Sequence, residues 1–256
     1  MEYSPGKIVW WELNTRTPAA FYTELVGWKK VEWPMPGGGG TYTMFGMNPE
    51  TAAVVGMAEM QPMVPKEVPA HWAPYVSVDD VDATAKAFTE NGGKVLAGPF
   101  DIPDQLRMAV CQDAAGGICN IMRSFKGDGP DLPSTHGCWH WAEYYSPNID
   151  ATLKFYSAVF GWTAEEMPVP NGKYYIFKKN GVQRAGAMPR PAEHIPPMWL
   201  AYLHVDDVDA TWKNATGGGA HQILAPMTAP GIGRFAQFVD PNGAVIGLIK
   251  PDRTRT

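Results

Sequence analysis

The chain has 256 residues, of which 45% are hydrophobic and 18% are charged, a globular composition that excludes a disordered or fibrous protein. The formal net charge is −5 and there is no run of Lys or Arg, so we expect neither nucleic acid nor a membrane as a partner. The start lacks the basic and apolar segments of a secretion signal. The three cysteines, Cys111, Cys119 and Cys138, lack zinc-type spacing, so we expect a cytoplasmic protein with reduced thiols.

Taken in chain order, the first half of the sequence predicts two modules of one strand, one helix and three further strands. The first helix is expected to begin near Thr17 and Pro18 and to end at Gly27, and Gly37 to Gly40 form a turn. The second helix begins at Asp79 or Asp80, where both carboxylates are interpreted as helix caps. The clearest strands are expected over residues 7–13, 41–46, 52–57, 75–78, 94–96, 108–112 and 118–122.

The second half of the sequence repeats the first. Residues 72–84 match residues 199–211 at a constant offset of 127 positions. Phe21-Tyr22 matches Phe155-Tyr156 at an offset of 134, and Trp10 and Glu12 match Trp141 and Glu143 at an offset of 131. Two copies therefore occupy residues 5–125 and 135–250, and each contains two βαβββ modules. We expect a first domain over residues 1–126, a Gly/Pro-rich linker over 127–134 and a second domain over 135–256.

The motifs within this repeat resemble those of the vicinal oxygen chelate superfamily, which includes glyoxalases, bleomycin-resistance proteins and extradiol dioxygenases. They are the Phe-Tyr pair and Gly-Trp at the first helix of each copy, the Val-Asp-Asp-Val-Asp-Ala helix start, and Asp240-Pro241-Asn242-Gly243 before the last strand. The tandem arrangement looks most like two-domain, glyoxalase-like bacterial proteins. The resemblance implies an α+β fold of tandem glyoxalase-like domains, whose four βαβββ units form curved mixed sheets around cavities.

The resemblance also implies a divalent metal, but the residues at the ligand positions argue against one. Where the family usually has His, His and Glu, this chain has Trp10, Ala73 and Asn120 in copy one, and Trp141, Leu200 and Gly247 in copy two. None of these residues is a carboxylate, imidazole or thiolate. We therefore expect no metal at the family position and no other cofactor. If a metal binds elsewhere, His140, Glu143 and His204 are the first candidates.

Strand alternation then indicates which side chains line the cavities. Trp10 and Glu12 lie two residues apart and share one face of their strand, as do Trp141, Glu143 and Tyr145. A carboxylate among aromatic rings loses its water, which favours a general base, so Glu143 and Glu12 are the candidate catalytic residues. Alternatively, each Glu meets solvent at a strand end, or forms a structural ion pair with Arg107 or Arg234.

Two further polar residues occur only in copy two. His204 shares strand parity with Leu200, and copy one has Ser77 in its place; Gln237 stands where copy one has Val110. The candidate ligand-binding residues are therefore Trp10, Trp141, Tyr145, His204 and Gln237. Drift in a half-exposed strand would also explain the differences between the copies.

The leading hypothesis is a metal-independent protein that binds a small aromatic or carbonyl-containing molecule, as a monomer (a pseudo-dimer of its two copies) or a homodimer. The first alternative is a glyoxalase-like lyase, isomerase, hydrolase or dioxygenase that uses Glu143 as its base or a non-standard metal site. The second is a protein-interaction or surface-antigen role in which the pockets are vestigial.

Overall fold

The computed structural model describes residues 2–16, 20–35, 40–60, 62, 64–169 and 172–252. The expected helix cap at Thr17 and Pro18 and most of the turn at Gly37 to Gly40 lie outside these residues. Among the described residues, no helix is both long enough and apolar enough to cross a membrane.

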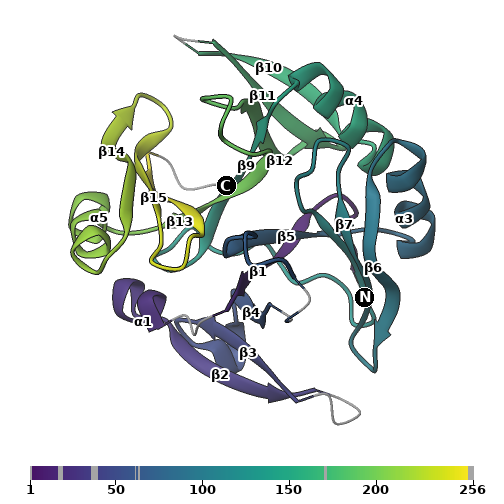
Figure 1. The fold of residues 1–256 in the computed structure, drawn as a ribbon, viewed down its shortest axis with the longest axis horizontal. Coiled ribbons are helices and arrows are strands. Elements are labelled where there is room, and N and C mark those ends of the chain that lie inside the picture. The colour runs from purple at the N-terminus through teal and green to yellow at the C-terminus, as the bar shows by residue number, and fades with distance from the viewer. Residues whose placement is uncertain are drawn as a thin grey trace. The chain divides into compact units, whose positions relative to one another are not determined.

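Each copy of the sequence forms one eight-stranded mixed sheet, and the tandem α+β fold is thereby confirmed (Figure 1). The first sheet has the order β2-β3-β4-β1-β5-β8-β7-β6. Within each module the first strand pairs parallel to the last, and the remaining pairs are antiparallel. The strands are β1 (Ile8–Thr15), β2 (Lys29–Pro34), β3 (Thr41–Gly46), β4 (Val55–Glu59), β5 (His71–Ser77), β6 (Lys94–Ile102), β7 (Leu106–Gln112) and β8 (Asn120–Ser124).

The second sheet repeats this order strand for strand, as β10-β11-β12-β9-β13-β16-β15-β14. The same rule of parallel pairing holds for β9 with β12 and for β13 with β16. The strands are β9 (Trp139–Ser146), β10 (Thr163–Val169), β11 (Gly172–Lys179), β12 (Val182–Pro189), β13 (Met198–His204), β14 (His221–Ala229), β15 (Gly233–Val239) and β16 (Val245–Pro251).

The three longest helices begin at side-chain caps. Asp80 accepts a hydrogen bond from the backbone N–H of Ala83 at 3.0 Å, and Asp207 accepts one from Ala210 at 3.0 Å, so these two aspartates act as N-caps. At the other end, Gly161 closes its helix with a φ of 62°, a conformation that glycine adopts without strain. The helices are α1 (Ala20–Val26), α2 (Pro49–Ala52), α3 (Val81–Glu90), α4 (Ile149–Phe160) and α5 (Val208–Gly217).

Contacts divide the chain into two compact units, and each unit mixes the two copies. Unit 1 consists of Met1–Trp10, Ala73–Pro130 and Ala142–Trp199, and unit 2 consists of Trp11–Trp72, Asp131–Trp141 and Leu200–Thr256. Unit 1 therefore combines the second module of copy one with the first module of copy two, and unit 2 combines the remaining two modules. The division into domains at residues 126 and 135 follows the repeat and the two sheets, and it stays a prediction.

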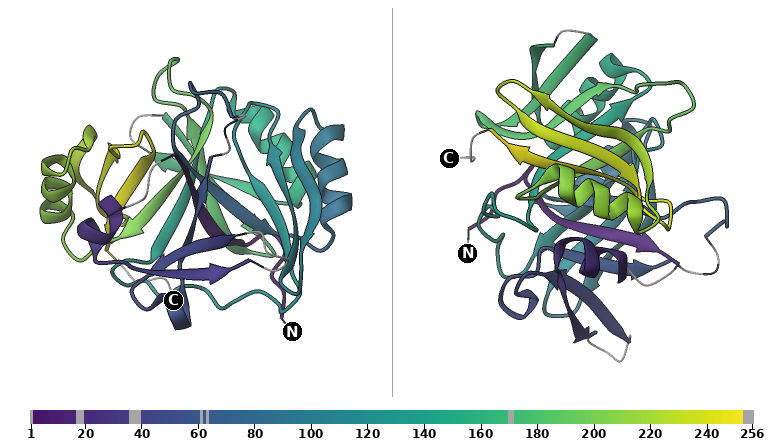
Figure 2. Two further views of the ribbon diagram at one scale, coloured as in Figure 1. Left: turned by 60° about the horizontal axis from the view of Figure 1, so that its bottom comes forward. Right: turned by 90° about the vertical axis from the view of Figure 1, so that its left-hand side faces the viewer.

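Within each unit, helices from different copies pack together. In unit 1, α3 lies beside α4, where Phe88 packs edge-to-face against Phe155 and Phe160 (Figure 1). In unit 2, α1 lies beside α5, and Phe21 of α1 packs edge-to-face against Phe238 of β15 (Figure 2). The apolar helix faces expected from the sequence are thus buried against a module of the other copy.

A buried carboxylate connects the two modules of unit 1. The Asp113 Oδ1 atom accepts hydrogen bonds from the backbone N–H groups of residues 115 to 117, each at 2.9 Å. Its Oδ2 atom accepts the hydroxyl of Tyr156 at 2.7 Å, and the Tyr156 oxygen in turn accepts the indole N–H of Trp199 at 3.0 Å. Burial and the neighbouring charge of Asp113 raise the pKa of Tyr156 well above its usual value, so the hydroxyl stays protonated.

Unit 2 contains the matching chain of hydrogen bonds with the copies exchanged. Asp240 of copy two accepts the hydroxyl of Tyr22 of copy one at 2.8 Å, and the Tyr22 oxygen accepts the indole N–H of Trp72 at 3.2 Å. The backbone N–H groups of Asn242 and Ala244 satisfy the second oxygen of Asp240. The Phe-Tyr and Asp-Pro-Asn-Gly motifs of the sequence therefore have a structural role, because they join one copy to the other.

We predict that Tyr156→Phe lowers the free energy of unfolding by about 2 kcal/mol, because it leaves a buried carboxylate oxygen and a buried indole N–H without partners. Urea denaturation measures this loss. The matched control is Tyr175→Phe, since the hydroxyl of Tyr175 donates to the exposed Glu166 and water can replace it. Equal losses for the two variants would contradict a structural role for the Asp113–Tyr156 bond.

Candidate functional site

The two candidate carboxylates lie on the first strand of each copy, on the face opposite the helices. In β1, Trp11 packs into the aromatic cluster of unit 2 that contains Trp139, so its neighbours Trp10 and Glu12 point the other way. Glu12 is 8% exposed, and its Oε2 atom accepts the hydroxyl of Tyr42 from β3 at 2.7 Å. Glu143 on β9 is 7% exposed. Neither carboxylate is solvated at a strand end.

The proposed ion pairs with arginine do not form. Arg107 bonds Asp82 and Asp101, and Arg234 bonds Asp209. These ion pairs depress the pKa values of Asp82 and Asp209, because each accepts hydrogen bonds from the guanidinium of its arginine. The two arginines therefore hold the starts of α3 and α5 to their sheets, and the buried glutamates belong to a different environment.

A glycine lies next to each buried glutamate on the adjacent parallel strand. Glu12 pairs in register with Gly56 of β4, and Glu143 pairs with Gly186 of β12. Glycine has no side chain, so no Cβ atom stands beside either carboxylate on the paired strand, and both glycines are buried. The sequence carries a glycine within the fourth strand of each copy, at an offset of 130 positions against 131 for the glutamates, and the strand pairing was needed to relate the two.

In unit 1, Trp10 packs against an apolar cluster of the same sheet. Tyr75, Met108 and Met122 are buried together, and the partly buried Trp10 packs against them. Asn120 lies two residues before Met122 on β8 and shares its face. Its side chain is 1% exposed, and its Oδ1 atom has no hydrogen-bond partner. A buried amide oxygen left without a donor costs about 1–3 kcal/mol, so this atom is a place where a ligand donor or a water would be stabilised.

The corresponding face of copy two, in unit 2, is filled by Tyr202. Gln237 donates to the Tyr202 hydroxyl at 2.7 Å, and the Tyr202 ring packs edge-to-face against Phe235. A Cβ atom at Gly247 would lie 2.3 Å from the Tyr202 ring. The ring therefore occupies the space in which the family's carboxylate would begin. Gln237, a predicted ligand-binding residue, holds this ring through its side-chain amide.

His204, another predicted ligand-binding residue, lies in a cluster with Ser134 and His140 in unit 2. The Ser134 Oγ atom lies 3.1 Å from Nδ1 of each imidazole, and the two rings are 6.1 Å apart. Burial lowers the pKa of His204, although the carboxylate of Asp206 acts in the opposite direction. The sequence grouped His140 with His204 only as candidates for a metal away from the family position, and the structure brings their side chains together around Ser134. The remaining candidates on β9 are Trp141, which is partly buried, and Tyr145, which is buried.

The residues at the family's metal position do not fit a metal. Ala73 and Leu200 are fully buried and carry no donor atom, and Gly247 is covered by the ring of Tyr202. Within the described ranges, no group of three or more His, Cys, Asp and Glu side chains is placed to hold an ion. His140 and His204 therefore form a pair of imidazoles without a third ligand of these types.

These observations define a class of protein: a tandem α+β fold whose mixed sheets carry a buried glutamate in each copy. The Glyoxalase/Bleomycin resistance protein/Dioxygenase superfamily model matches residues 16–118 and 139–248, and the chain belongs to this family.

Similar proteins extend over almost the whole chain. The chain is 37% identical to the "Putative glyoxylase CFP32" of Mycobacterium tuberculosis, over 98% of this chain and 97% of the relative. It is 29% identical to the anthracycline biosynthesis protein DnrV of Streptomyces peucetius, over 97% of this chain and 94% of the relative. The Mn(II)-bound glyoxalase of Novosphingobium aromaticivorans shares the fold with a TM-score of 0.62 and 18% identity, covering 95% of this chain and 81% of that protein.

We predict that Gly247→Ala destabilises the protein by about 1–3 kcal/mol, because the new methyl group clashes with the ring of Tyr202. The double variant Gly247→Ala with Tyr202→Ala should lose about 1 kcal/mol less than the sum of the two single variants. Chemical denaturation of the four proteins measures this coupling. Strictly additive losses would show that the ring does not occupy the position of the family's carboxylate.

Proposed function

We propose that this chain is a metal-independent small-molecule binding protein, in which a buried glutamate on the first strand of each copy hydrogen bonds the ligand. The observation that carries the proposal is the pairing of Glu12 with Gly56 and of Glu143 with Gly186. A buried carboxylate is a strong acceptor for a ligand hydroxyl or N–H. The misfit of the family's metal position supports a mode of binding that uses no metal.

The proposed ligand is an aromatic molecule that carries carbonyl and hydroxyl groups. Trp10, Tyr75, Met108 and Met122 give unit 1 an aromatic and polarizable surface, of the kind that adapts to planar apolar ligands. The unpartnered Oδ1 atom of Asn120 offers an acceptor on the same face. The name of the relative DnrV supports this ligand class, because anthracyclines are polycyclic aromatic compounds with carbonyl groups.

The two copies are proposed to bind different ligands or to bind with different strengths. Copy one has the buried amide of Asn120 at the position where copy two has Gly247 and the covering ring of Tyr202. Tyr75 pairs in register with Asn120 as Tyr202 pairs with Gly247, so the copies differ here in the amide of Asn120, which has no counterpart at Gly247. We also propose a cytoplasmic location and no nucleic-acid partner, from the composition and charge of the sequence.

A second candidate function is an enzyme of the same family that works without a metal. The burial of Glu143 favours this reading, because a carboxylate held away from water is suited to take a proton from a group next to a carbonyl. The carboxylate would then return the proton to a different atom of the same molecule, as in an isomerase or lyase. The name of the mycobacterial relative points in the same direction.

We predict that Glu143→Gln weakens binding of a dihydroxyanthraquinone by about 10- to 100-fold, since it removes the charge from a hydrogen bond worth about 1.5–3 kcal/mol. The melting temperature should change little, because the substitution keeps the shape of the side chain. Quenching of tryptophan fluorescence measures the affinity. Glu12→Gln tests the other copy, and the exposed Glu90→Gln serves as the surface control. Unchanged affinity in Glu143→Gln, or a large loss of stability, would assign Glu143 a structural role.

We further predict that the purified protein contains far less than one equivalent of zinc, nickel, iron or manganese. Elemental analysis before and after treatment with a chelator measures the content, and dihydroxyanthraquinone binding is titrated in both samples. Equal binding in both samples is the expected result. A stoichiometric metal whose removal abolishes binding would overturn the metal-independent proposal and would direct attention to His140 and His204.

A further inference from the structure

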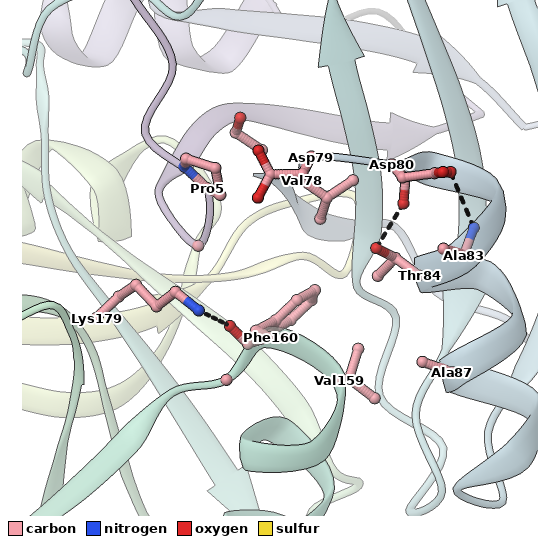
Figure 3. A pocket seen from close by; sticks show the side chains of 13 residues that line it. Pro5, Val78, Asp79, Asp80, Ala83, Thr84, Ala87, Val159, Phe160 and Lys179 are labelled. Carbon is pink, nitrogen blue, oxygen red and sulfur yellow. Dashed lines mark hydrogen bonds between the residues drawn. The ribbon is translucent and has the colours of Figure 1, made fainter.

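Unit 1 contains a cavity of about 370 Å³ away from the faces of the sheets discussed above (Figure 3). Its walls come from the start of α3, including Asp79 and Ala83, and from the end of α4, including Phe160. The segment before β1 contributes Pro5. None of the residues predicted from the sequence to bind a ligand lines this cavity.

The duplication shows what fills the same place in unit 2. The indole N–H of Trp162 donates to the carbonyl of Gly6 at 3.0 Å, and the indole N–H of Trp28 donates to the carbonyl of Gly137 at 2.9 Å. Gly6 and Gly137 are thus equivalent, and so are the residues that precede them, Pro5 and His136. The position held by Pro5 beside the cavity is held by an imidazole in unit 2.

That imidazole bridges two backbone groups of unit 2. The Nε2 atom of His136 lies 3.2 Å from the carbonyl oxygen of Val26, at the end of α1. Its Nδ1 atom accepts the backbone N–H of Asp206 at 3.2 Å. Nδ1 therefore acts at this place as an acceptor for a backbone N–H.

In unit 1 no single side chain bridges the counterparts of the Val26 carbonyl and the Asp206 N–H among the described residues. The carbonyl of Phe160, the counterpart of Val26, accepts the ammonium of Lys179 at 2.8 Å (Figure 3). The backbone N–H of Asp79, the counterpart of Asp206, has no hydrogen-bond partner within the part of the chain that the structure describes. At the counterpart of the Asp206 N–H, unit 1 therefore keeps a backbone donor to which the described residues give no partner, and the cavity adjoins it.

We propose that this cavity binds a small planar nitrogen heterocycle of the imidazole class. An unprotonated ring nitrogen accepts the N–H of Asp79, as Nδ1 of His136 accepts that of Asp206, and the ring lies between Pro5 and Ala83. The carboxylates of Asp79 and Asp80 lie on one side and the ammonium of Lys179 on the other. Asp79 contacts Arg123 at 3.4 Å and Asp80 caps α3, so the cavity holds both signs of charge and favours a neutral, dipolar ring over an anion.

The test is an NMR titration of the full chain with 4-methylimidazole at a pH where this probe is neutral. The expected result is a saturable shift of the Asp79 amide signal, with little change for N-methylpyrrole, which has the same size but no acceptor nitrogen. In Pro5→His the shift is lost, because the new side chain occupies the cavity, whereas Pro5→Ala keeps it. An Asp79 signal unmoved in the wild type, or a Pro5→His variant that binds like the wild type, would overturn the proposal.

Unit 2 supplies the reciprocal experiment. His136→Ala should open the equivalent space, so 4-methylimidazole should then shift the Asp206 amide and recover part of the melting temperature lost by the substitution. Failure of this rescue would remove the equivalence on which the proposal rests.

Discussion

A buried carboxylate that accepts a tyrosine hydroxyl from the other copy is the interaction on which this duplicated fold depends. A charge removed from water needs several donors, and Asp113 receives three from its own turn and one from Tyr156. Asp240 is completed in the same way by Tyr22. A single copy contains the aspartate and the tyrosine but not the partner of either, so the two copies complete their cores only together.

Because the recognisable motifs of the sequence make these buried hydrogen bonds, they identify the fold but not the ligand or the reaction. Each of the two hydrogen-bonded chains of the core contains the tyrosine of a Phe-Tyr pair, the aspartate of a closing turn and a Trp from the first strand of a second module. The proposed ligand contacts lie on the opposite faces of the sheets, where the copies share a glutamate beside a glycine but differ at Asn120 and Gly247.

The sequence predicted the tandem repeat, the four modules and the helix caps at Asp80 and Asp207, because constant offsets and local hydrogen bonds are properties of nearby residues. It also predicted that Glu12 and Glu143 share faces with Trp10 and Trp141, since alternation along a strand is local. It did not predict which modules pack together, because an apolar stripe on α3 specifies burial but not the helix that covers it. The sequence also did not predict that the ring of Tyr202 covers Gly247, because this contact is made by a side chain between two different strands.

Pro5 and His136 occupy equivalent positions, and each unit satisfies the carbonyl at its helix end with a different donor. As a result, a cavity lies beside Pro5 in unit 1, whereas the imidazole of His136 occupies the equivalent place in unit 2. The carbonyl at the end of a helix has no partner within the helix and needs an external donor. Unit 2 supplies it from the imidazole of His136, and unit 1 supplies it from the ammonium of Lys179. The lysine satisfies the carbonyl but not the neighbouring N–H of Asp79, because an ammonium group has no acceptor. The use of Lys179 in place of an imidazole therefore gives the carbonyl at the end of α4 its donor, and it leaves the N–H of Asp79 for the proposed ligand.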